Sequence, residues 1–299
     1  MNATTEQMSA ALAATQARTR LMPVDISEWD VARSMPMDMT FAPLSFDETN
    51  KAVECHRAVV NEVGEFIAPV SFRYTIIQHK DLLNQLTKHL TILGMTPDSI
   101  QMHLSQNHTR MRLRVFFTDN SKEITVGDTI QLGIEVINRH DRSSSAILKL
   151  VAKRLACTNG MTVSDTLDSF SQWHTGEWDG EELDNWLLTT TDAFASFIDN
   201  QMSPLLATPM TYAQFGKLLT APDEPVSEDD PEADLHRGLN KRTTKRIINR
   251  FQQYADELGE NAWAGYNAFT HFASHETSSV EQSERIEKLA NTFAKLAVA

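Results

Sequence analysis

Cysteine and long apolar runs are the two features in which this sequence is poorest. Its 299 residues include only Cys55 and Cys157, too few for a disulfide framework or a cysteine-ligated zinc site. There is no run of roughly 18 apolar residues, so we expect no transmembrane helix. The first residues also lack the apolar core of a secretory signal. These absences favour a protein of the reducing cytoplasm with no membrane partner.

Familiar catalytic signatures are missing as well. The sequence contains no GxxxxGK[ST] phosphate loop, no GxGxxG at the start of a helix, no HExxH and no GxSxG. A P-loop ATPase, a dinucleotide enzyme and the enzymes marked by the last two motifs are therefore disfavoured. We expect no cofactor, no resident metal and a binding role rather than catalysis. The alternative that the protein is an enzyme is kept.

Charge is unevenly distributed along the chain, although the net charge is −13. Residues 73–154 carry 12 Lys and Arg against 7 Asp and Glu, whereas residues 164–236 carry 16 acids and one lysine. The segment 237–250 then holds six basic residues and no acid. Such segregation is typical of a nucleic-acid surface or an interacting tail. The acidic block can equally shield the basic regions, within one chain or between subunits.

The stretch TRMRLRVFFT, residues 109–118, is the most informative one. Arg110, Arg112 and Arg114 alternate with apolar residues, which is the pattern of a half-buried strand. We expect the three guanidinium groups to lie on a solvated face of this β-strand, about 7 Å apart. This distance is close to the spacing of phosphates along an extended nucleic-acid strand. The alternative is an ordinary solvated face paired with neighbouring acids.

Further basic and aromatic residues accompany this strand. Lys149 and Lys153 share one face of a candidate strand, and Arg73 precedes Tyr74, which we expect to stack on a base. In the segment 237–250, basic residues recur at helical spacing; they either contact phosphates or pair with the acidic block.

Periodicity predicts an α+β protein with a mainly antiparallel core at about residues 51–160 and a helical C-terminal half. We expect an N-terminal arm with helices (1–50), this core, a helical segment (161–220), an acidic linker (221–236) and C-terminal helices (237–299). Short helices are predicted at 5–20 and at 27–35, the latter with Ser27 as N-cap. Longer helices are predicted at 79–94, 240–256 and 280–297, and strands at 99–105, 109–117 and 129–138. The segment 146–157 fits either a strand or a helix.

Two histidine clusters leave chemical alternatives open. His271 and His275 have the i, i+4 spacing of metal ligands, but no third ligand is evident, and packing among aromatic residues is the simpler explanation. His140 and Asp141 stand in a serine-rich turn, where such residues are also favoured structurally. A hydrolase or nuclease would require these two residues to meet Asn159 and His275.

Three strings carry a family resemblance: RYTIIQHKDLLN, VINRHDRSSSAILKLVAKRLACTNGM and AWAGYNAFTHFASH. They resemble the phage- and plasmid-like family of unknown function DUF932, over about residues 70–160 and 260–276. The resemblance maps the family motif onto Tyr74, Gln78, Asn138, His140, Asp141, Ser144, Arg154, Cys157, Asn159, Trp263, Tyr266, Asn267, Thr270 and His275. Arg139 and Arg142 depart from it, because the family has small residues around His-Asp. The resemblance implies an origin in a phage, prophage or plasmid, and favours a strand over 145–157.

Together these features favour a nucleic-acid-binding protein of a mobile element that binds or anneals single-stranded DNA during recombination. In this hypothesis Arg110, Arg112, Arg114, Lys149, Lys153 and Arg73 hold phosphates, and Tyr74 stacks on a base. Annealing proteins of this kind commonly form rings, so we expect a homo-oligomer. The alternative is an anti-defence protein in the host cytoplasm, whose acidic stretch from Asp223 to Asp234 blocks a host defence complex.

Overall fold

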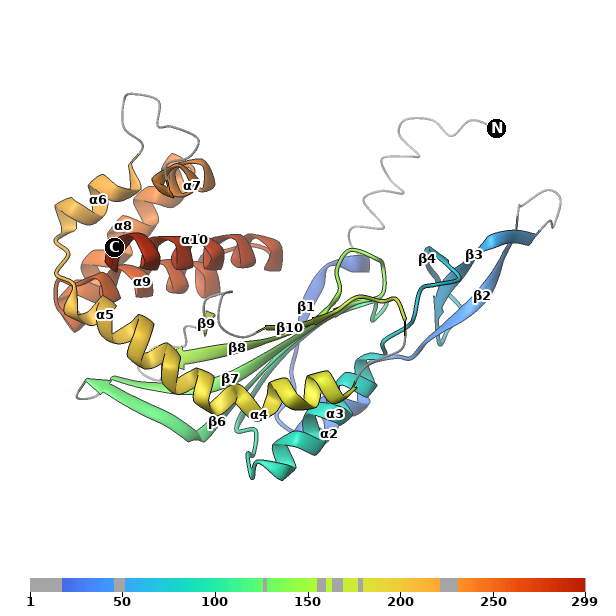
Figure 1. Cartoon of the computed structure of the whole chain (residues 1–299). Helices are drawn as coiled ribbons and strands as arrows, with labels where there is room; N and C mark the ends of the chain where they lie inside the picture. Colours follow the sequence, from blue (N-terminus) through green and yellow to red (C-terminus); the bar gives the residue numbers. More distant parts are fainter. Residues whose placement is uncertain are drawn as a thin grey trace, which may run out of the picture. The chain divides into compact units, whose positions relative to one another are not determined.

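The arginine-rich segment is a long strand in the larger of two antiparallel sheets (Figure 1). The computed structural model describes residues 18–45, 52–125, 128–154, 160–162, 169–176, 180–220 and 231–298. The strands are β1 (Leu21–Val24), β2 (Met39–Ser45), β3 (Ala52–Asn61), β4 (Phe66–Ser71), β5 (Ser99–Ser105), β6 (Arg110–Thr125), β7 (Asp128–Arg139), β8 (Ala146–Arg154), β9 (Gly160–Thr162) and β10 (Ser169–Gln172). The helices are α2 (Trp29–Ser34), α3 (His79–Ile92), α4 (Gly180–Phe197), α5 (Ser203–Ala207), α6 (Tyr212–Leu219), α7 (Pro231–Gly238), α8 (Lys241–Leu258), α9 (Ala262–His271) and α10 (Val280–Val298), with π-helical turns η1 (Ile198–Met202) and η2 (Phe272–Glu276).

The larger sheet has the strand order β1-β5-β6-β7-β8-β10, and β9 also pairs with β8. The smaller sheet has the order β2-β3-β4. All pairings for which the register is known are antiparallel. The predicted α+β fold, an antiparallel core followed by a helical C-terminal half, is therefore confirmed. None of the described helices combines the length and apolarity that a membrane span requires.

The chain divides into two units, and each is built from separate stretches of sequence. The first unit comprises residues 1–119, 133–150 and 168–190; the second comprises residues 120–132, 151–167 and 191–299. Strands β6, β7 and β8 and helix α4 are long enough to supply residues to both units.

In the first unit, helix α3 packs through a leucine stripe. Leu82, Leu83, Leu86 and Leu90 are buried, at the spacing of one helix face. Gly94 has a φ of +65° just beyond the helix, a conformation that glycine adopts without steric cost. The first turns of α4 lie beside α3, because Gln85 donates hydrogen bonds to the Gly180 carbonyl and to the Asp184 carboxylate, both at 2.9 Å.

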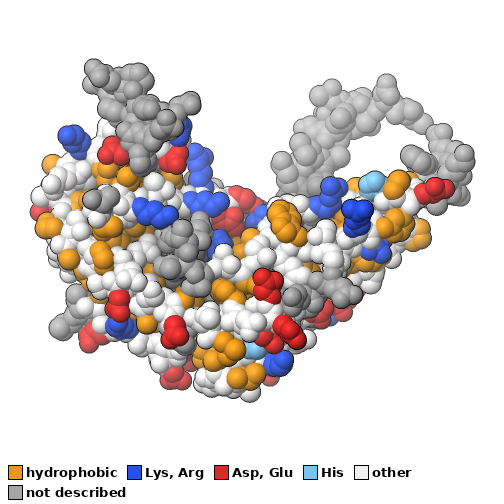
Figure 2. Space-filling model, in the orientation of Figure 1, with side chains coloured by type: hydrophobic (Ala, Val, Ile, Leu, Met, Phe, Trp, Pro, Cys, Tyr) orange, Lys and Arg blue, Asp and Glu red, His pale blue; other side chains and the backbone are white. Residues whose placement is uncertain are grey.

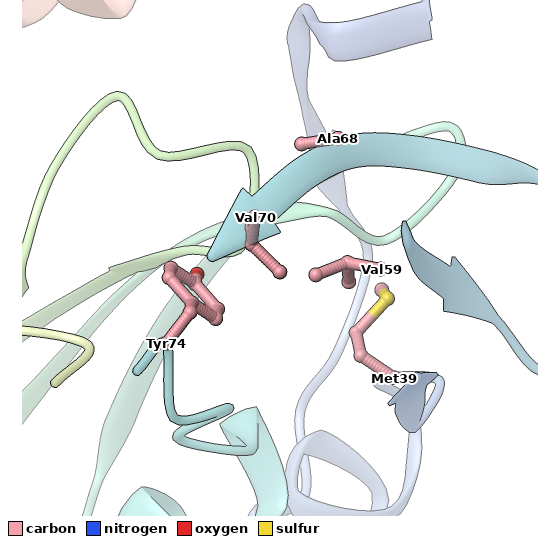
Figure 3. Close-up of a cluster of buried hydrophobic side chains, with 5 residues drawn as sticks. All are labelled: Met39, Val59, Ala68, Val70 and Tyr74. Atoms are coloured by element: carbon pink, nitrogen blue, oxygen red, sulfur yellow. The ribbon is translucent and has the colours of Figure 1, made fainter. Parts of the chain in front are cut away.

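The three-stranded sheet has a small core of its own (Figure 3). Side chains from all three strands and the following loop gather there: Met39, Val59, Ala68, Val70 and Tyr74, none of them more than 8% exposed. Gln78 ties β2 to the start of α3, because its side-chain oxygen accepts from the Met39 N–H at 2.9 Å and its amide donates to the Met39 carbonyl at 2.6 Å.

The second unit is organised around phenylalanine rings. The ring centroid of Phe215 lies 4.5 Å from that of Phe251 and 5.4 Å from that of Phe293, and Phe269 stacks on Phe293 at 5.4 Å. Gly265 lets α9 approach these rings closely. A Cβ at this position would lie 2.6 Å from Cζ of Phe293 and 2.9 Å from Cε2 of Phe215.

We expect Gly265→Ala to destabilise the second unit by about 1–3 kcal/mol, because the added methyl overfills an aromatic core. Gly216 is the matched control, since it also lies in a helix but meets only Cδ1 of Ile248, at 4.0 Å. Gly216→Ala should stabilise by up to about 1 kcal/mol through helix propensity. Urea unfolding of both variants measures the difference. Equal effects of the same sign would show that the rings do not limit the space at Gly265.

Several local predictions need correction. Helix α2 begins after Glu28, which makes no side-chain cap, so Ser27 is not the N-cap. The chain is not uniformly helical after Gly160, because β9 and β10 complete the sheet before α4 begins. The predicted acidic linker ends early, since residues 231–236 form most of α7, where burial of Ala233 and Leu235 favours the helix. The helix predicted at 5–20 lies almost entirely outside the described residues.

Candidate nucleic-acid interface

Strand β6 carries its three arginines on one face, as the alternation predicts, but that face is not solvated. Arg112 is 5% exposed and Arg114 is 8% exposed. Their Nε atoms both donate to Oε1 of Glu135 on β7, each at 2.6 Å. Arg110 is partly buried, and its Nε donates to Asp141 at 2.5 Å. The prediction of a solvated face is therefore wrong for Arg112 and Arg114, because both are buried and share a buried carboxylate on the neighbouring strand.

Glu135 is the residue that the sequence argument missed. Burial raises the pKa of its carboxyl, but the charges of Arg112 and Arg114, assisted by Lys149, outweigh this and hold the pKa far below its ordinary value. A signal was present in the sequence, because Glu135 is the only acid within the apolar run TIQLGIEVIN. A carboxylate is almost never fully buried without a partner, so this position predicts buried cations nearby.

The other residues expected to hold phosphates have different surroundings. Lys149 and Lys153 lie on one face of β8 and are partly buried, whereas Arg154 lies on the other face and is 1% exposed. Burial lowers the pKa of Lys153. Arg73 is exposed in the loop after β4. Of this set, Arg73 has the open side chain that phosphate contact requires.

Tyr74 does not offer a stacking platform, contrary to the prediction. It is 8% exposed and stacks on the ring of His174, with centroids 5.0 Å apart. Burial raises the pKa of its hydroxyl well above the ordinary value, with a further contribution from Asp141.

The His-Asp turn belongs to a buried histidine cluster, formed by His79, His140 and His174. The ring centroids of His79 and His140 are 4.2 Å apart, and those of His140 and His174 are 5.9 Å apart. Each ring has a nitrogen close to a main-chain carbonyl: His108 at 2.9 Å, Ile77 at 2.9 Å and Thr75 at 3.2 Å.

Burial disfavours the protonated, charged form of these histidines. It lowers the pKa of His140 to about 4 and that of His79 well below its ordinary value. Asn138 joins the cluster, because its amide donates to the Ile77 carbonyl at 2.7 Å and lies 3.0 Å from Nδ1 of His79. His79 and His174 were not expected from the sequence, since they are distant from the His-Asp turn along the chain.

The turn itself has a structural explanation. Asp141 accepts from the Ser143 N–H at 3.1 Å and from its hydroxyl at 2.5 Å, which is a side-chain-stabilised turn. Arg142 has a φ of +67°, where glycine is favoured. The Arg142 guanidinium donates to the Pro69 carbonyl at 3.1 Å.

Motif residues of the second unit form a buried polar network. Arg154 donates to Asp128 through Nε and to Glu257 at 2.7 Å, and Trp263 Nε1 donates to Asp128 at 3.1 Å. Asn267 is fully buried and donates to the Trp263 carbonyl at 2.9 Å. These contacts indicate that this part of the motif stabilises the fold. Asn159 and Cys157 lie outside the described residues.

His275 lies in the second unit, beside His271, with ring centroids 4.8 Å apart. Tyr254 Oη is 2.9 Å from Nδ1 of His271, and burial lowers the pKa of His271 to about 4. Across the described parts of both units, no group of three His, Cys, Asp or Glu side chains has the arrangement of a metal site. His140 and Asp141 thus contact residues of the first unit, whereas His275 contacts residues of the second unit. These contacts give no support to the hydrolase or nuclease hypothesis.

Helix α8 divides its basic residues between two roles. Arg246 and Arg250 bind Glu276, each at 2.5 Å, so they serve the packing of η2. Lys241, Arg242 and Lys245 are exposed, and within the described ranges none of them pairs with a carboxylate. Figure 2 shows Lys and Arg side chains gathered on the helical part of the molecule. Within the basic segment, the cations available to a ligand therefore lie in the first turns of α8.

A cavity of about 440 Å³ adjoins these lysines. Its lining comes from α6, the end of α7 and α8, all within the second unit. Tyr212, which is 42% exposed, supplies an aromatic wall. This combination of cations and an accessible ring was not anticipated, because Tyr212 lies far from the basic segment in the sequence.

The smaller sheet offers a second, more apolar surface. The Arg57 guanidinium lies 3.2 Å from the ring centroid of Phe41 and 5.7 Å from that of Phe72. Its main-chain partner is the Tyr74 carbonyl, at 2.7 Å. These contacts hold Arg57 in place, so it stabilises the sheet.

Comparison with known proteins identifies one family. A family model described as a domain of unknown function, DUF932, matches residues 67–293, which is most of the chain. No curated protein and no solved structure matches the sequence.

Proposed function

Since the chain belongs to the DUF932 family, whose description assigns no function, we propose one from the side chains that remain open. We propose that this is a nucleic-acid-binding protein of a phage, prophage or plasmid, acting on single-stranded DNA in recombination. The contact surface in this proposal is the exposed start of α8, not strand β6. The observation that carries it is a set of three exposed cations, Lys241, Arg242 and Lys245, which pair with no carboxylate among the described residues. Lys241 and Lys245 line a cavity together with the open aromatic ring of Tyr212.

Phosphate contacts in proteins come from Lys, Arg and the N-termini of helices. Lys241 is the first residue of α8, and Asn240 caps the helix by accepting from the Thr243 N–H at 2.9 Å. An exposed aromatic ring near such cations supports stacking on a base of any sequence. The acidic net charge of the chain makes the expected affinity modest and strongly dependent on salt.

The test is fluorescence anisotropy of labelled single-stranded and double-stranded DNA at several salt concentrations. Lys241→Ala/Arg242→Ala/Lys245→Ala should weaken single-strand binding and flatten the plot of log K against log salt by about 2, because each phosphate contact on a single strand contributes about 0.7. Absence of binding by the wild type at low salt would refute the proposal.

The matched control is Arg18→Ala/Lys88→Ala/Lys122→Ala. These side chains are 59%, 64% and 49% exposed, and each already pairs with a carboxylate. The control changes the net charge by the same amount, so a general electrostatic effect would appear in both triple variants. Only a specific contact at α8 predicts a larger loss in the first.

Homo-oligomerisation remains part of this proposal, since annealing requires many contacts along a strand. Light scattering with and without the oligonucleotide measures it. The anti-defence alternative rests on the acidic stretch from Asp223 to Asp234, of which residues 223–230 lie outside the described ranges. A wild-type protein that binds no nucleic acid would favour this alternative.

A further inference from the structure

The cavity beside α8 has the size of a site for one small ligand. Its volume is about 440 Å³, near the lower end of the range of about 300–1,000 Å³ typical of small-molecule sites. Leu219, Leu239 and Ile248 supply apolar surface, and Tyr212 supplies an aromatic one. A body the size of a nucleobase with its sugar fits such a site better than an extended chain does.

The aromatic wall is held in place. The ring of Tyr212 lies 6.5 Å from that of Phe251, which in turn stacks on Phe215 at 4.5 Å. Phe215 and Phe251 are fully buried, whereas Tyr212 is 42% exposed. A planar ligand therefore meets a ring that the core supports from behind, which is the arrangement that base stacking uses.

The charge of the lining selects an anion. Lys241 and Lys245 lie one turn apart on α8 and both line the cavity. The lining residues, all from described helices and their ends, include no Asp or Glu. Two ammonium groups in a described lining without carboxylates match a phosphate group better than a neutral ligand.

Polar side chains that line the cavity can form hydrogen bonds with the remaining groups of a ligand. The hydroxyl of Thr220 donates to the Gly216 carbonyl at 2.8 Å, and that of Thr244 donates to the Asn240 carbonyl at 3.1 Å. Both hydroxyl oxygens consequently keep lone pairs for a donor, such as an exocyclic amine. Asn249 adds an exposed amide, which can both donate and accept.

From these features we infer that the α6–α7–α8 cavity binds a nucleoside monophosphate unit, with its phosphate on Lys241 and Lys245 and its base against Tyr212. The ligand is either a free mononucleotide or the 5′-phosphorylated end of a single strand. The second source rests on the proposed function, whereas the first does not.

Isothermal titration of the full chain with AMP, CMP, GMP and UMP tests this inference. We expect binding of a monophosphate, and at least about tenfold weaker binding of the matching nucleoside, which lacks the phosphate. Lys241→Ala/Lys245→Ala should weaken binding by a similar factor, and Tyr212→Ala by about five- to a hundredfold. Tyr212→Phe should retain it, and the exposed Lys217→Ala on α6 is the control outside the lining.

The inference is overturned if no monophosphate binds, if inorganic phosphate binds as tightly as the nucleotides, or if the lysine variant binds normally. Oligonucleotides with 5′-phosphate and 5′-hydroxyl ends separate the two sources. If the 5′-phosphorylated oligonucleotide binds more tightly and added mononucleotide removes this difference by competition, the strand end binds in the cavity. Equal binding of both oligonucleotides assigns the cavity to a free nucleotide.

Arg242 separates this inference from the proposed function. It is exposed on the same turn of α8 but does not line the cavity. Arg242→Ala should therefore weaken single-strand binding and leave mononucleotide binding unchanged. Strand binding without mononucleotide binding overturns the inference alone, and mononucleotide binding without strand binding overturns the function alone.

Discussion

Replacing Glu135 by glutamine should cost the first unit about 3–5 kcal/mol, because it removes the negative charge that two buried guanidinium groups share. The carboxylate is fully buried, and Arg112 and Arg114 converge on one of its oxygens. Glutamine preserves the shape of the side chain, so the expected loss reports charge rather than packing. Since domains are stable by only about 5–15 kcal/mol, the loss should lower the urea midpoint of the first unit markedly.

Asp30→Asn is the matched control for Glu135→Gln. It also removes a carboxylate charge from an arginine, Arg33, at 2.7 Å and within the same unit. Asp30 is 84% exposed, and an exposed pair contributes little to stability. Hydrogen exchange followed peptide by peptide assigns each loss to its unit. Similar small effects of both variants would contradict a neutralising role for Glu135.

Acidification from about pH 7 to about pH 5 should destabilise the first unit by about 2 kcal/mol through His140, and His79 acts in the same direction. An unfolded histidine has a pKa of about 6.5, whereas burial lowers the pKa of folded His140 to about 4. Between these values the unfolded chain binds a proton that the folded chain excludes. Stability therefore falls as the pH falls through this window, and is insensitive to these groups above it.

The carboxylates with lowered pKa values, Glu135 and Asp141 among them, lose their contribution only at lower pH. Acidification from pH 7 to 5 therefore leaves these carboxylates charged while it titrates the histidines. In His140→Gln the slope of stability against pH should fall by about 1.4 kcal/mol per pH unit. NMR titration of the His140 ring gives an independent value, and protonation near pH 6.5 in the folded protein would contradict the prediction.

Secondary-structure elements were predicted from the sequence more accurately than the tertiary contacts between them. Alternation in residues 110–117 identified β6, and the leucine spacing identified α3, because each pattern is local. Burial of Arg112 and Arg114 depends instead on the register that brings Glu135 beside them. A period-2 pattern shows that two faces differ, but it does not show which face the rest of the chain covers.

The candidate site was predicted in part for the same reason. The basic segment at α8 was recognised from composition, yet its division into bound and open residues depends on Glu276, which follows in η2. Tyr212 joins the site only because α6 packs on α8. The histidine cluster likewise unites His79, His140 and His174 from three separate segments, and no local pattern connects them.

The interleaved units also determine the order in which this chain can fold during synthesis. The first unit is completed only when residues up to 190 have left the ribosome, because β10 and the first turns of α4 belong to it. By then the segments 120–132 and 151–167 of the second unit have already emerged, ahead of the helices they join. Neither unit can be excised as one continuous fragment, so a C-terminal truncation at any point removes residues from the second unit and, before residue 190, from both.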